Sequence, residues 1–375
     1  MNDITQFNFP TTIRFGKNVI AELPQYLKSN NIKRPLIVTD KFLVDLAFFK
    51  NIIIDLEKHK LSPLIFNDIS KNPVRPDVHK GADFYNENHC DSIIGVGGGA
   101  SMDVARAIAL KANHSNDLFY YEEGVGGDKF ITNPIPHFIA VPTTAGTGSE
   151  VGRSAIISDE ITHEKKILFH PNLLAKIIFA DPMLTMDLPA PITAATGMDA
   201  LTHNIEAYFS KMWHPMCDGI AIEGIKLIKK SIKTATLNPD YQSRKNMLLG
   251  SLMGAVAFQK GLGVVHSMAH PMSSLFDTHH GLANAIALPY GVRFNKEVVP
   301  EKYKDISEIF KTVDLFSFLT NLNVELGLPT KFSKLGVTEN DIEKLSALAI
   351  DDFCHPSNPR TLTIDLFKEL YRETL

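Results

Sequence analysis

The chain has 375 residues, 44% hydrophobic and 21% charged, which is typical of a globular protein long enough for two domains. The net charge of −4, the pI near 6.4 and the lack of a long Lys/Arg run exclude an obvious nucleic-acid partner. No apolar run approaches the roughly 18 to 20 residues that a membrane helix requires, and no signal segment is evident, so we expect no membrane partner. Three widely separated cysteines without a CxxC pattern favour a reducing compartment. We therefore expect a cytoplasmic protein.

Alternating strand and helix patterns fill the first half of the chain. The predicted strands lie at residues 7–15, 34–40, 64–66, 92–96, 138–142 and 175–181. The predicted helices lie at residues 18–29, 42–59 and 78–88. A loop is expected at 113–128, and a strand-rich excursion at 151–169. This alternation indicates a parallel α/β sheet.

Strand patterns almost disappear after Pro182. Helical spacing of apolar residues follows at 192–210, 218–235, 243–258, 264–276, 282–292 and 306–326. We therefore predict an α/β domain over residues 1–185 and an all-helical domain over residues 186–375.

A glycine turn follows the predicted strand at 92–96, in the phrase SIIGVGGGASMDVARAIAL. Because Gly97, Gly98 and Gly99 lack a Cβ atom, the backbone could approach a pyrophosphate that faces the N-terminus of the next helix. Ser101 is predicted as the N-cap of that helix. The match to the dinucleotide pattern is loose, and the alternative is a tight turn without a ligand.

An acidic residue that binds the ribose usually follows such glycines by about 20 positions. Here the best candidate, Asp40, precedes them at the end of a predicted strand, so we expect a variant of the dinucleotide-binding topology. A carboxylate at this place can accept both ribose hydroxyls and repels a 2′-phosphate, which favours NAD over NADP. The alternative is a solvated acid at a strand end.

A second candidate cofactor loop is PTTAGTGSEV, residues 142–151. Its hydroxyls could bind phosphate and ribose oxygens, although such loops often serve only as turns. The four hydroxyl side chains belong to Thr143, Thr144, Thr147 and Ser149.

Four of the 14 histidines fall within 15 residues, at 266, 270, 279 and 280. His266 and His270 are four apart and share one face of a predicted helix. Upstream, Asp199 and His203 have the same spacing. Imidazole is the commonest metal ligand, so these blocks indicate a metal site or a proton-transfer site. The alternative for the histidine block is a surface with incidental histidines.

Both blocks resemble the metal-binding signatures of the iron-containing (group III) alcohol dehydrogenase family. The family pattern is Asp-x3-His, then His-x3-His-Pro, then a final His before Gly, and it is met at Asp199, His203, His266, His270 and His280. PTTAGTGSEV is close to a word-for-word match, GGGASMDVA resembles the family's GGGSxxD motif, and FPTTIRFG resembles its opening strand.

The resemblance implies a variant Rossmann-like NAD-binding domain and a helical metal- and substrate-binding domain. From the residue arguments above and from this match together, the expected NAD contacts are Asp40, Asn72, Gly97, Gly98, Gly99, Ser101, Asp103, Thr143, Thr144, Thr147 and Ser149. One divalent ion, Fe(II) or alternatively Zn(II), is expected in the cleft between the domains, because Mg and Ca prefer more oxygen ligands. Its ligands are expected to be Asp199, His203, His266 and His280. His270 is expected to relay a proton or position the substrate, and the alternative is a structural role.

The expected activity is metal-dependent hydride transfer between a small primary alcohol, or its aldehyde, and NAD. The alternatives are a polyol or hydroxyacid dehydrogenase acting on glycerol, lactaldehyde, propanediol or 4-hydroxybutyrate, or a non-catalytic nucleotide- or metal-binding protein. His279 stands where the family often has Pro, and Gln259-Lys260 shorten the preceding segment, so both departures concern the substrate side. The resemblance also implies a homodimer or a higher homo-oligomer.

Overall fold

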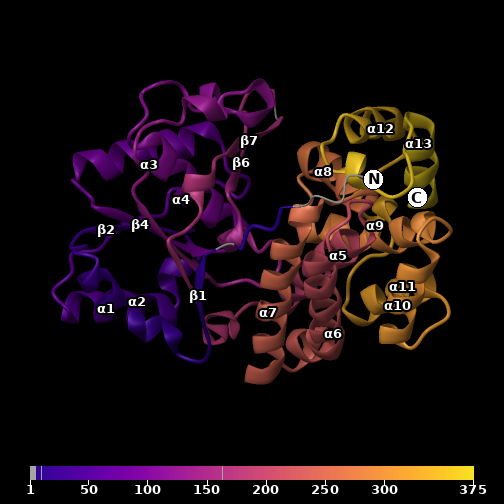
Figure 1. Cartoon of the computed structure of the whole chain (residues 1–375), viewed down its shortest axis with the longest axis horizontal. Coiled ribbons are helices and arrows are strands. Elements are labelled where there is room, and N and C mark those ends of the chain that lie inside the picture. Colours follow the sequence, from indigo (N-terminus) through magenta and orange to yellow (C-terminus); the bar gives the residue numbers. More distant parts are fainter. Residues whose placement is uncertain (1–5, 10, 163) are drawn as a thin grey trace. The chain divides into compact units, whose positions relative to one another are not determined.

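The computed structural model describes residues 6–9, 11–162 and 164–375, and the chain separates into two compact units (Figure 1). The α/β unit comprises residues 10–144 and 149–185, and the helical unit comprises the N-terminal segment up to Phe9, residues 145–148 and residues 186–375. Part of the predicted cofactor loop therefore groups with the helices, and a single cut after residue 185 does not describe either unit in full.

The α/β unit is built on a six-stranded parallel sheet with the order β1-β8-β5-β4-β2-β3. Its strands are β1 (Thr12–Phe15), β2 (Pro35–Val38), β3 (Leu64–Phe66), β4 (Ser92–Gly97), β5 (His137–Pro142) and β8 (Ile177–Ala180). The strands β2, β4 and β8 are buried along their whole length, as expected where helices cover both faces of a parallel sheet. The predicted fold class is confirmed.

Two layers of helices cover the sheet (Figure 1). The helices α1 (Leu23–Ser29) and α2 (Ala47–Lys58) lie on one face, where Leu27 and Leu56 join a core with alternate strand residues such as Ile94. The helices α3 (Arg75–Glu87) and α4 (Gly99–Lys111) lie on the other face. Successive side chains of a strand point to opposite faces, so each strand contributes residues to the core on both sides of the sheet.

The strand order accounts for the position of Asp40 before the glycine turn. The chain passes outward from β2 to β3 and then returns to place β4 on the opposite side of β2. At such a switch point the loops at the carboxyl ends diverge and leave a crevice for a ligand. Asp40 follows β2, and the three glycines begin with the last residue of β4, so both candidates lie at the same end of neighbouring strands.

The excursion predicted at 151–169 contains an antiparallel pair, β6 (Ser154–Ser158) and β7 (Lys165–Phe169). The segment 113–128, predicted as a loop, contains only short 3₁₀ turns at 118–121 and 123–125 and the start of another at 128–130. The hairpin packs along α4, which thereby contacts both the main sheet and the excursion.

The helical unit contains no strand among its described residues. Its helices are α5 (Ala190–Phe209), α6 (Pro215–Leu237), α7 (Tyr241–Ala257), α8 (Val264–Phe276), α9 (His280–Asn295), α10 (Pro300–Phe310), α11 (Leu315–Glu325), α12 (Ile342–Ile350) and α13 (Ile364–Glu373). The single helix predicted at 306–326 is wrong. Lys311 adopts a left-handed conformation with φ 56° and ends α10, and the Asp314 side chain accepts from the Ser317 N–H to begin α11.

Helix α5 is the central element of this unit. It packs against α6, α7 and α9, and every residue from Thr193 to Phe209 is buried. A helix that is buried all round contributes side chains to the interior in every direction. Polar residues on α5 must therefore find partners inside the protein.

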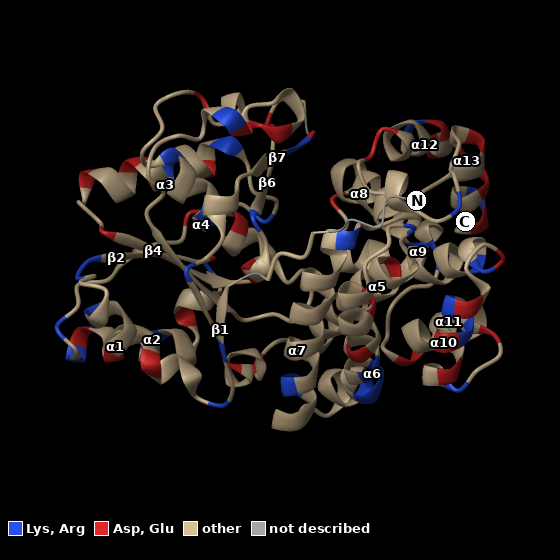
Figure 2. Ribbon diagram, in the orientation of Figure 1, with Lys and Arg blue, Asp and Glu red and all other residues tan. Residues whose placement is uncertain are grey.

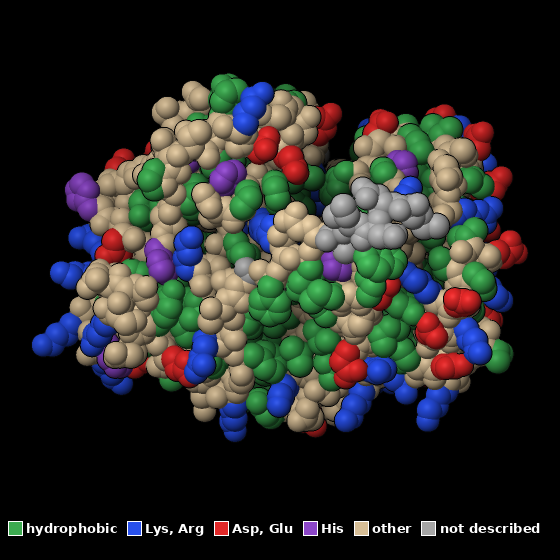
Figure 3. Space-filling model, viewed as in Figure 1, with side chains coloured by type: hydrophobic (Ala, Val, Ile, Leu, Met, Phe, Trp, Pro, Cys, Tyr) green, Lys and Arg blue, Asp and Glu red, His purple; other side chains and the backbone are tan. Residues whose placement is uncertain are grey.

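Acidic and basic residues are interspersed along the ribbon of both units (Figure 2). On the face seen in Figure 3, hydrophobic side chains gather over α6 and α7. No single helix among the described residues is long and apolar enough to cross a membrane. The segments Tyr241–Lys260 and Val264–Phe276 reach that length and composition only together, across a bend of 108°.

Candidate metal centre

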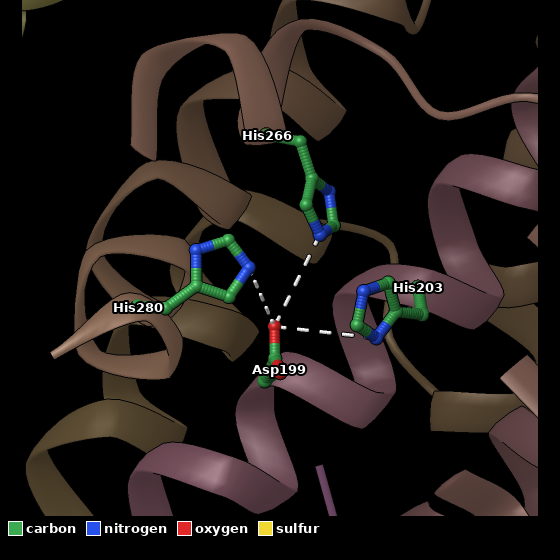
Figure 4. Close-up of side chains that lie close together, drawn as sticks. All are labelled: Asp199, His203, His266 and His280. Carbon is green, nitrogen blue, oxygen red and sulfur yellow. Dashed lines mark ion pairs between the residues drawn. The ribbon is translucent and has the colours of Figure 1, made fainter. Parts of the chain in front are cut away.

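Three helices bring four side chains to one point, as Figure 4 shows. Asp199 and His203 lie one turn apart on α5, His266 lies in the first turn of α8, and His280 is the first residue of α9. The predicted ligand set is thus brought together from segments that are up to 81 residues apart in the chain.

The ligand atoms are close enough for one ion to bridge them. Asp199 Oδ1 lies 3.5 Å from His280 Nε2, and 4.0 Å from both His266 Nε2 and His203 Nδ1. All four ligand atoms lie within 4.8 Å of one another. Since metal–ligand bonds of this kind are about 2.0–2.2 Å long, the set needs only a slight contraction around an ion.

The buried His203 imidazole fits a metal ligand. Burial lowers the pKa of His203 to about 4, so the ring is neutral at pH 7. The ring hydrogen-bonds the backbone of Gly146, and its Nδ1 atom has no hydrogen-bond partner among the described residues. A buried acceptor without a partner costs about 1–3 kcal/mol, and a divalent ion at this point would satisfy it.

Glu206, one turn after His203 on α5, contacts the start of α8. Its Oε1 accepts from the Val265 N–H at 2.7 Å, and its Oε2 lies 2.6 Å from His266 Nδ1. The same Oε2 accepts from the His266 N–H at 3.3 Å. Glu206 was not predicted from the sequence, although its spacing of three from His203 and seven from Asp199 places it on the same face of the helix.

Asn284 lies among three of the four ligands. Its Nδ2 donates to Asp199 Oδ1 at 2.7 Å and lies 3.2 Å from His266 Nε2 and 3.1 Å from His280 Nε2. This residue was also missed. The signal that could have found it is its spacing of four from His280, the same spacing that relates Asp199 to His203.

His270 lies one turn after His266 but belongs to a different cluster. Its Nδ1 is 2.6 Å from Asp352 Oδ2, and its ring stacks on that of His280 with centroids 5.3 Å apart. The ring of Phe353, which is more than half exposed, also lies near the His270 ring, with centroids 5.5 Å apart. Asp352 and Phe353 lie beyond the sequence motifs and were not predicted.

The Asp352 carboxylate is held by several donors. Burial alone would raise its pKa, but His270 and the hydrogen bonds to the carboxylate hold the pKa well below its usual range. The donors include the Ser267 hydroxyl at 2.6 Å and the Cys354 N–H at 2.9 Å. Burial raises the pKa of the Cys354 thiol, which favours a protonated thiol over a metal-binding thiolate. His279 precedes α9 at the N-cap position and is not among the four convergent ligands.

In the α/β unit, the helix after the glycine turn begins earlier than predicted. Helix α4 starts at Gly99 with Gly98 as its N-cap, so Ser101 lies inside the first turn and the N-cap prediction is wrong. The reason is that the extended backbone of Gly98 already ends the turn. Gly97 has φ 148°, and a Cβ atom there would lie 2.5 Å from Ser101 Oγ, so a side chain at this position is excluded.

Asp103 and Ser149 contact each other. Asp103 Oδ1 accepts from Ser149 Oγ at 2.7 Å and from Arg106 Nη1 at 3.2 Å, and its Oδ2 accepts from the Ile156 N–H at 3.3 Å. Arg106 is fully buried and also donates to the Leu173 carbonyl. This network connects α4 to Ser149 and to the strand β6 that follows the hydroxyl-rich loop. It was not predicted from the sequence.

The other predicted cofactor residues lie at or near strand ends. The Thr143 N–H donates to the Gly97 carbonyl at 3.0 Å, which joins the loops after β4 and β5, and Thr144 follows directly. Asp40 Oδ1 accepts from the N–H groups of Phe42 and Leu43. Asn72 is exposed between β3 and α3, and Thr147 lies in the part of the loop that groups with the helical unit.

Residues 10–182 match the family described as iron-containing alcohol dehydrogenase. Residues 193–375 match the C-terminal domain of the Fe-containing alcohol dehydrogenase family. The chain belongs to this family, as predicted. It is 37% identical to 4-hydroxybutyrate dehydrogenase of Cupriavidus necator, over 97% of this chain and 98% of that protein. It is 36% identical to 1,3-propanediol dehydrogenase of Citrobacter freundii, over 97% of both chains.

Solved structures show the same fold. A crystal structure of 1,3-propanediol oxidoreductase matches with a TM-score of 0.94 and 33% identity, over 99% of this chain and all of the other. A crystal structure of sulfoacetaldehyde reductase from Bifidobacterium kashiwanohense, in complex with NAD+, matches with a TM-score of 0.89 and 29% identity, over 99% and 98% of the two chains. Family membership confirms the predicted class, an oxidoreductase acting on alcohols.

Proposed function

We propose that the protein is a metal-dependent dehydrogenase that oxidises small primary alcohols with NAD and reduces the corresponding aldehydes. The observation that supports this most directly is the convergence of one carboxylate oxygen and three imidazole nitrogens from α5, α8 and α9. We propose Fe(II) as the ion and Zn(II) as the alternative, because this mixture of nitrogen and oxygen ligands suits both.

These four residues would hold a divalent ion that would supply Lewis acidity toward the alcohol oxygen, and bound NAD would supply the hydride acceptor. The side chains of Asp199, His203 and His266 are at most 5% exposed, so they exclude water from one side of the cluster. His280 is 25% exposed. The accessible side of the cluster is therefore that of His280 and the stacked His270.

His270 is the proposed proton relay. Because Asp352 can only accept a hydrogen bond, the proton of a neutral His270 is on Nδ1, and Nε2 is left as an acceptor. The alcohol proton would pass to this nitrogen during oxidation and return from it during reduction. The exposed Phe353 beside it supplies an apolar surface for a substrate chain.

For the cofactor, we propose a site at the switch point between β2 and β4. The glycine turn at Gly97, Gly98 and Gly99 would hold the pyrophosphate. Asp40 Oδ1 accepts from its own turn, and the other carboxylate oxygen would bind the ribose. The remaining proposed residues are Asn72, Ser101, Asp103, Thr143, Thr144, Thr147 and Ser149. Asp103 and Ser149 support this site by holding the loop to α4.

A second candidate substrate carries an additional polar group at the far end of the chain. The relatives named 4-hydroxybutyrate dehydrogenase and 1,3-propanediol dehydrogenase, at 37% and 36% identity, favour such a bifunctional primary alcohol. The substrate panel must therefore include terminal diols and ω-hydroxy acids beside simple alcohols.

The testing experiment measures NAD reduction by this panel on protein reconstituted anaerobically with Fe(II) or Zn(II). We expect metal-dependent turnover that is absent from the His266→Ala variant. Turnover that is equal with and without metal would reject the metal centre. NADP preferred over NAD would reject the role of Asp40.

We also propose a homodimer or a higher homo-oligomer located in the cytoplasm. The hydrophobic side chains over α6 and α7 support self-association, and three free cysteines support a reducing compartment. Sedimentation at the mass of a single 41.6 kDa chain would contradict the oligomer.

A further inference from the structure

The contact between Glu206 and His266 has a chemical consequence for the ligand cluster. The Glu206 side chain is 4% exposed and that of His266 is 1% exposed, so neither group has access to bulk water. Both Glu206 oxygens are used: one accepts from the Val265 N–H, and the other from the His266 backbone and ring. Glu206 therefore contacts α8 at its first turn and at the ligand ring together.

The direction of this hydrogen bond determines which ring nitrogen of His266 carries the hydrogen. An ionised carboxylate is only an acceptor, so the ring nitrogen 2.6 Å away must carry the hydrogen. A neutral imidazole with its hydrogen on Nδ1 has its lone pair on Nε2. In this structure Nε2 is the atom that faces Asp199, at 4.0 Å.

The backbone contacts fix the position of the same ring. The first N–H groups of a helix have no partner within the helix, and Glu206 accepts from two of them, those of Val265 and His266. The carboxylate also lies at the positive end of the α8 dipole. One side chain thus holds the helix start and the orientation of the ring that the helix carries.

We infer that Glu206 is a positioning residue: it locks His266 in the tautomer and orientation that a divalent metal requires. This inference rests on the proposed metal centre and extends it by one residue on α5. Asp199, His203 and Glu206 share one face of this helix, so α5 supplies two ligands and the support for a third.

The direct test uses Glu206→Gln, which keeps the size of the side chain. Glutamine has one acceptor oxygen and one donor amide, so it cannot satisfy both the Val265 N–H and the His266 Nδ1–H. Metal affinity is measured by competition with a chelator, using Zn(II) and Co(II), and the Co(II) absorption spectrum reports the ligand geometry. We expect affinity to fall about 10- to 100-fold, with an altered Co(II) spectrum.

Asp352→Asn is the matched control, because it changes the equivalent contact on His270, one turn further along α8. We expect this variant to bind metal as tightly as the wild type, with the same Co(II) spectrum. Equal losses in both variants would overturn the inference, because the effect would then belong to any buried carboxylate beside this helix. Unchanged affinity in Glu206→Gln would leave Glu206 as a helix cap only and would also overturn it.

A measurement on the wild type keeps the inference testable if Glu206→Gln does not fold. Nitrogen-15 NMR of the metal-free protein distinguishes the two tautomers of each neutral histidine. We expect His266 to carry its hydrogen on Nδ1 before metal is added, and a hydrogen on Nε2 would overturn the inference. A wild type that binds neither metal would instead reject the proposed metal centre, so the two failures are distinguishable.

Discussion

Two histidines one turn apart on α8, His266 and His270, each contact a buried carboxylate. The contact is the same in both pairs, but the proposed functions of the two histidines differ. In both pairs a carboxylate oxygen is 2.6 Å from the histidine Nδ1 atom. His266 is 1% exposed and directs Nε2 into the ligand cluster, whereas His270 is 14% exposed and stacks on the outer ligand His280. The hydrogen bond fixes the tautomer in each pair, and the surroundings of Nε2 decide between metal binding and proton transfer.

Alanine variants of the two histidines should separate metal binding from proton transfer. We expect His266→Ala to lose bound metal and all metal-dependent turnover, because it removes one of four ligands and leaves Glu206 buried without its ring partner. Metal content by elemental analysis and NAD reduction are the measurements. A variant that retained stoichiometric metal and turnover would show that His266 is not a ligand.

His270→Ala should behave differently. We expect metal content to stay at the wild-type level while kcat falls about 10²- to 10⁴-fold, the usual contribution of a positioned acid–base group. Partial rescue by added imidazole would indicate that the missing function is proton transfer. A loss of metal equal to that of His266→Ala would place His270 among the ligands and remove the distinction between the pairs.

These pairs also show what the sequence could predict. The pairs Asp199–His203 and His266–His270 were visible because spacing of four on one helix needs no knowledge of the fold. The pairing of Glu206 with His266 and of Asp352 with His270 was not visible, because the partners are 60 and 82 residues apart and meet only through tertiary packing.

The fold likewise has features that local patterns predicted and features that they did not. Alternating apolar runs predicted the parallel sheet, and helical spacing predicted the five helices α5 to α9 after Pro182. It merged α10 with α11 and did not predict α12 or α13. The strand order, which brings Asp40 beside the glycine turn, depends on long-range pairing that no local pattern encodes. The break at Lys311 was missed because a lysine in the left-handed region gives no signal of the kind that glycine gives.

Glu150, a buried carboxylate in the α/β unit, has its pKa shifted in the opposite direction to that of Asp352. Its Oε1 atom has no hydrogen-bond partner among the described residues, and burial raises the pKa of Glu150 from 4.5 to about 7. Asp352, held by His270 and other donors, shows the opposite direction. The donors around a buried carboxylate therefore decide the sign of the shift.

The raised pKa of Glu150 makes the free energy of unfolding depend on pH. Because the folded state raises the pKa of Glu150, its protonated form favours folding below pH 4.5, and this contribution is lost as the pH rises through about 7. We expect Glu150→Gln to gain up to about 3 kcal/mol in the free energy of unfolding relative to wild type between pH 4.5 and 8. Urea unfolding of both proteins across this range is the measurement, and a pH-independent difference would contradict the expectation.

The smallest expected effect concerns Asn284, whose amide donates to Asp199 and lies against two ligand nitrogens. Asn284→Leu keeps a similar volume but removes a hydrogen bond to a buried carboxylate, which is worth about 1.5–3 kcal/mol. We expect the metal-free protein to lose about this amount, and the metal-loaded protein to lose less, because an ion would also neutralise Asp199. Thermal unfolding with and without metal measures the difference. Equal losses in the two states would mean that Asn284 supports α9 and not the ligand cluster.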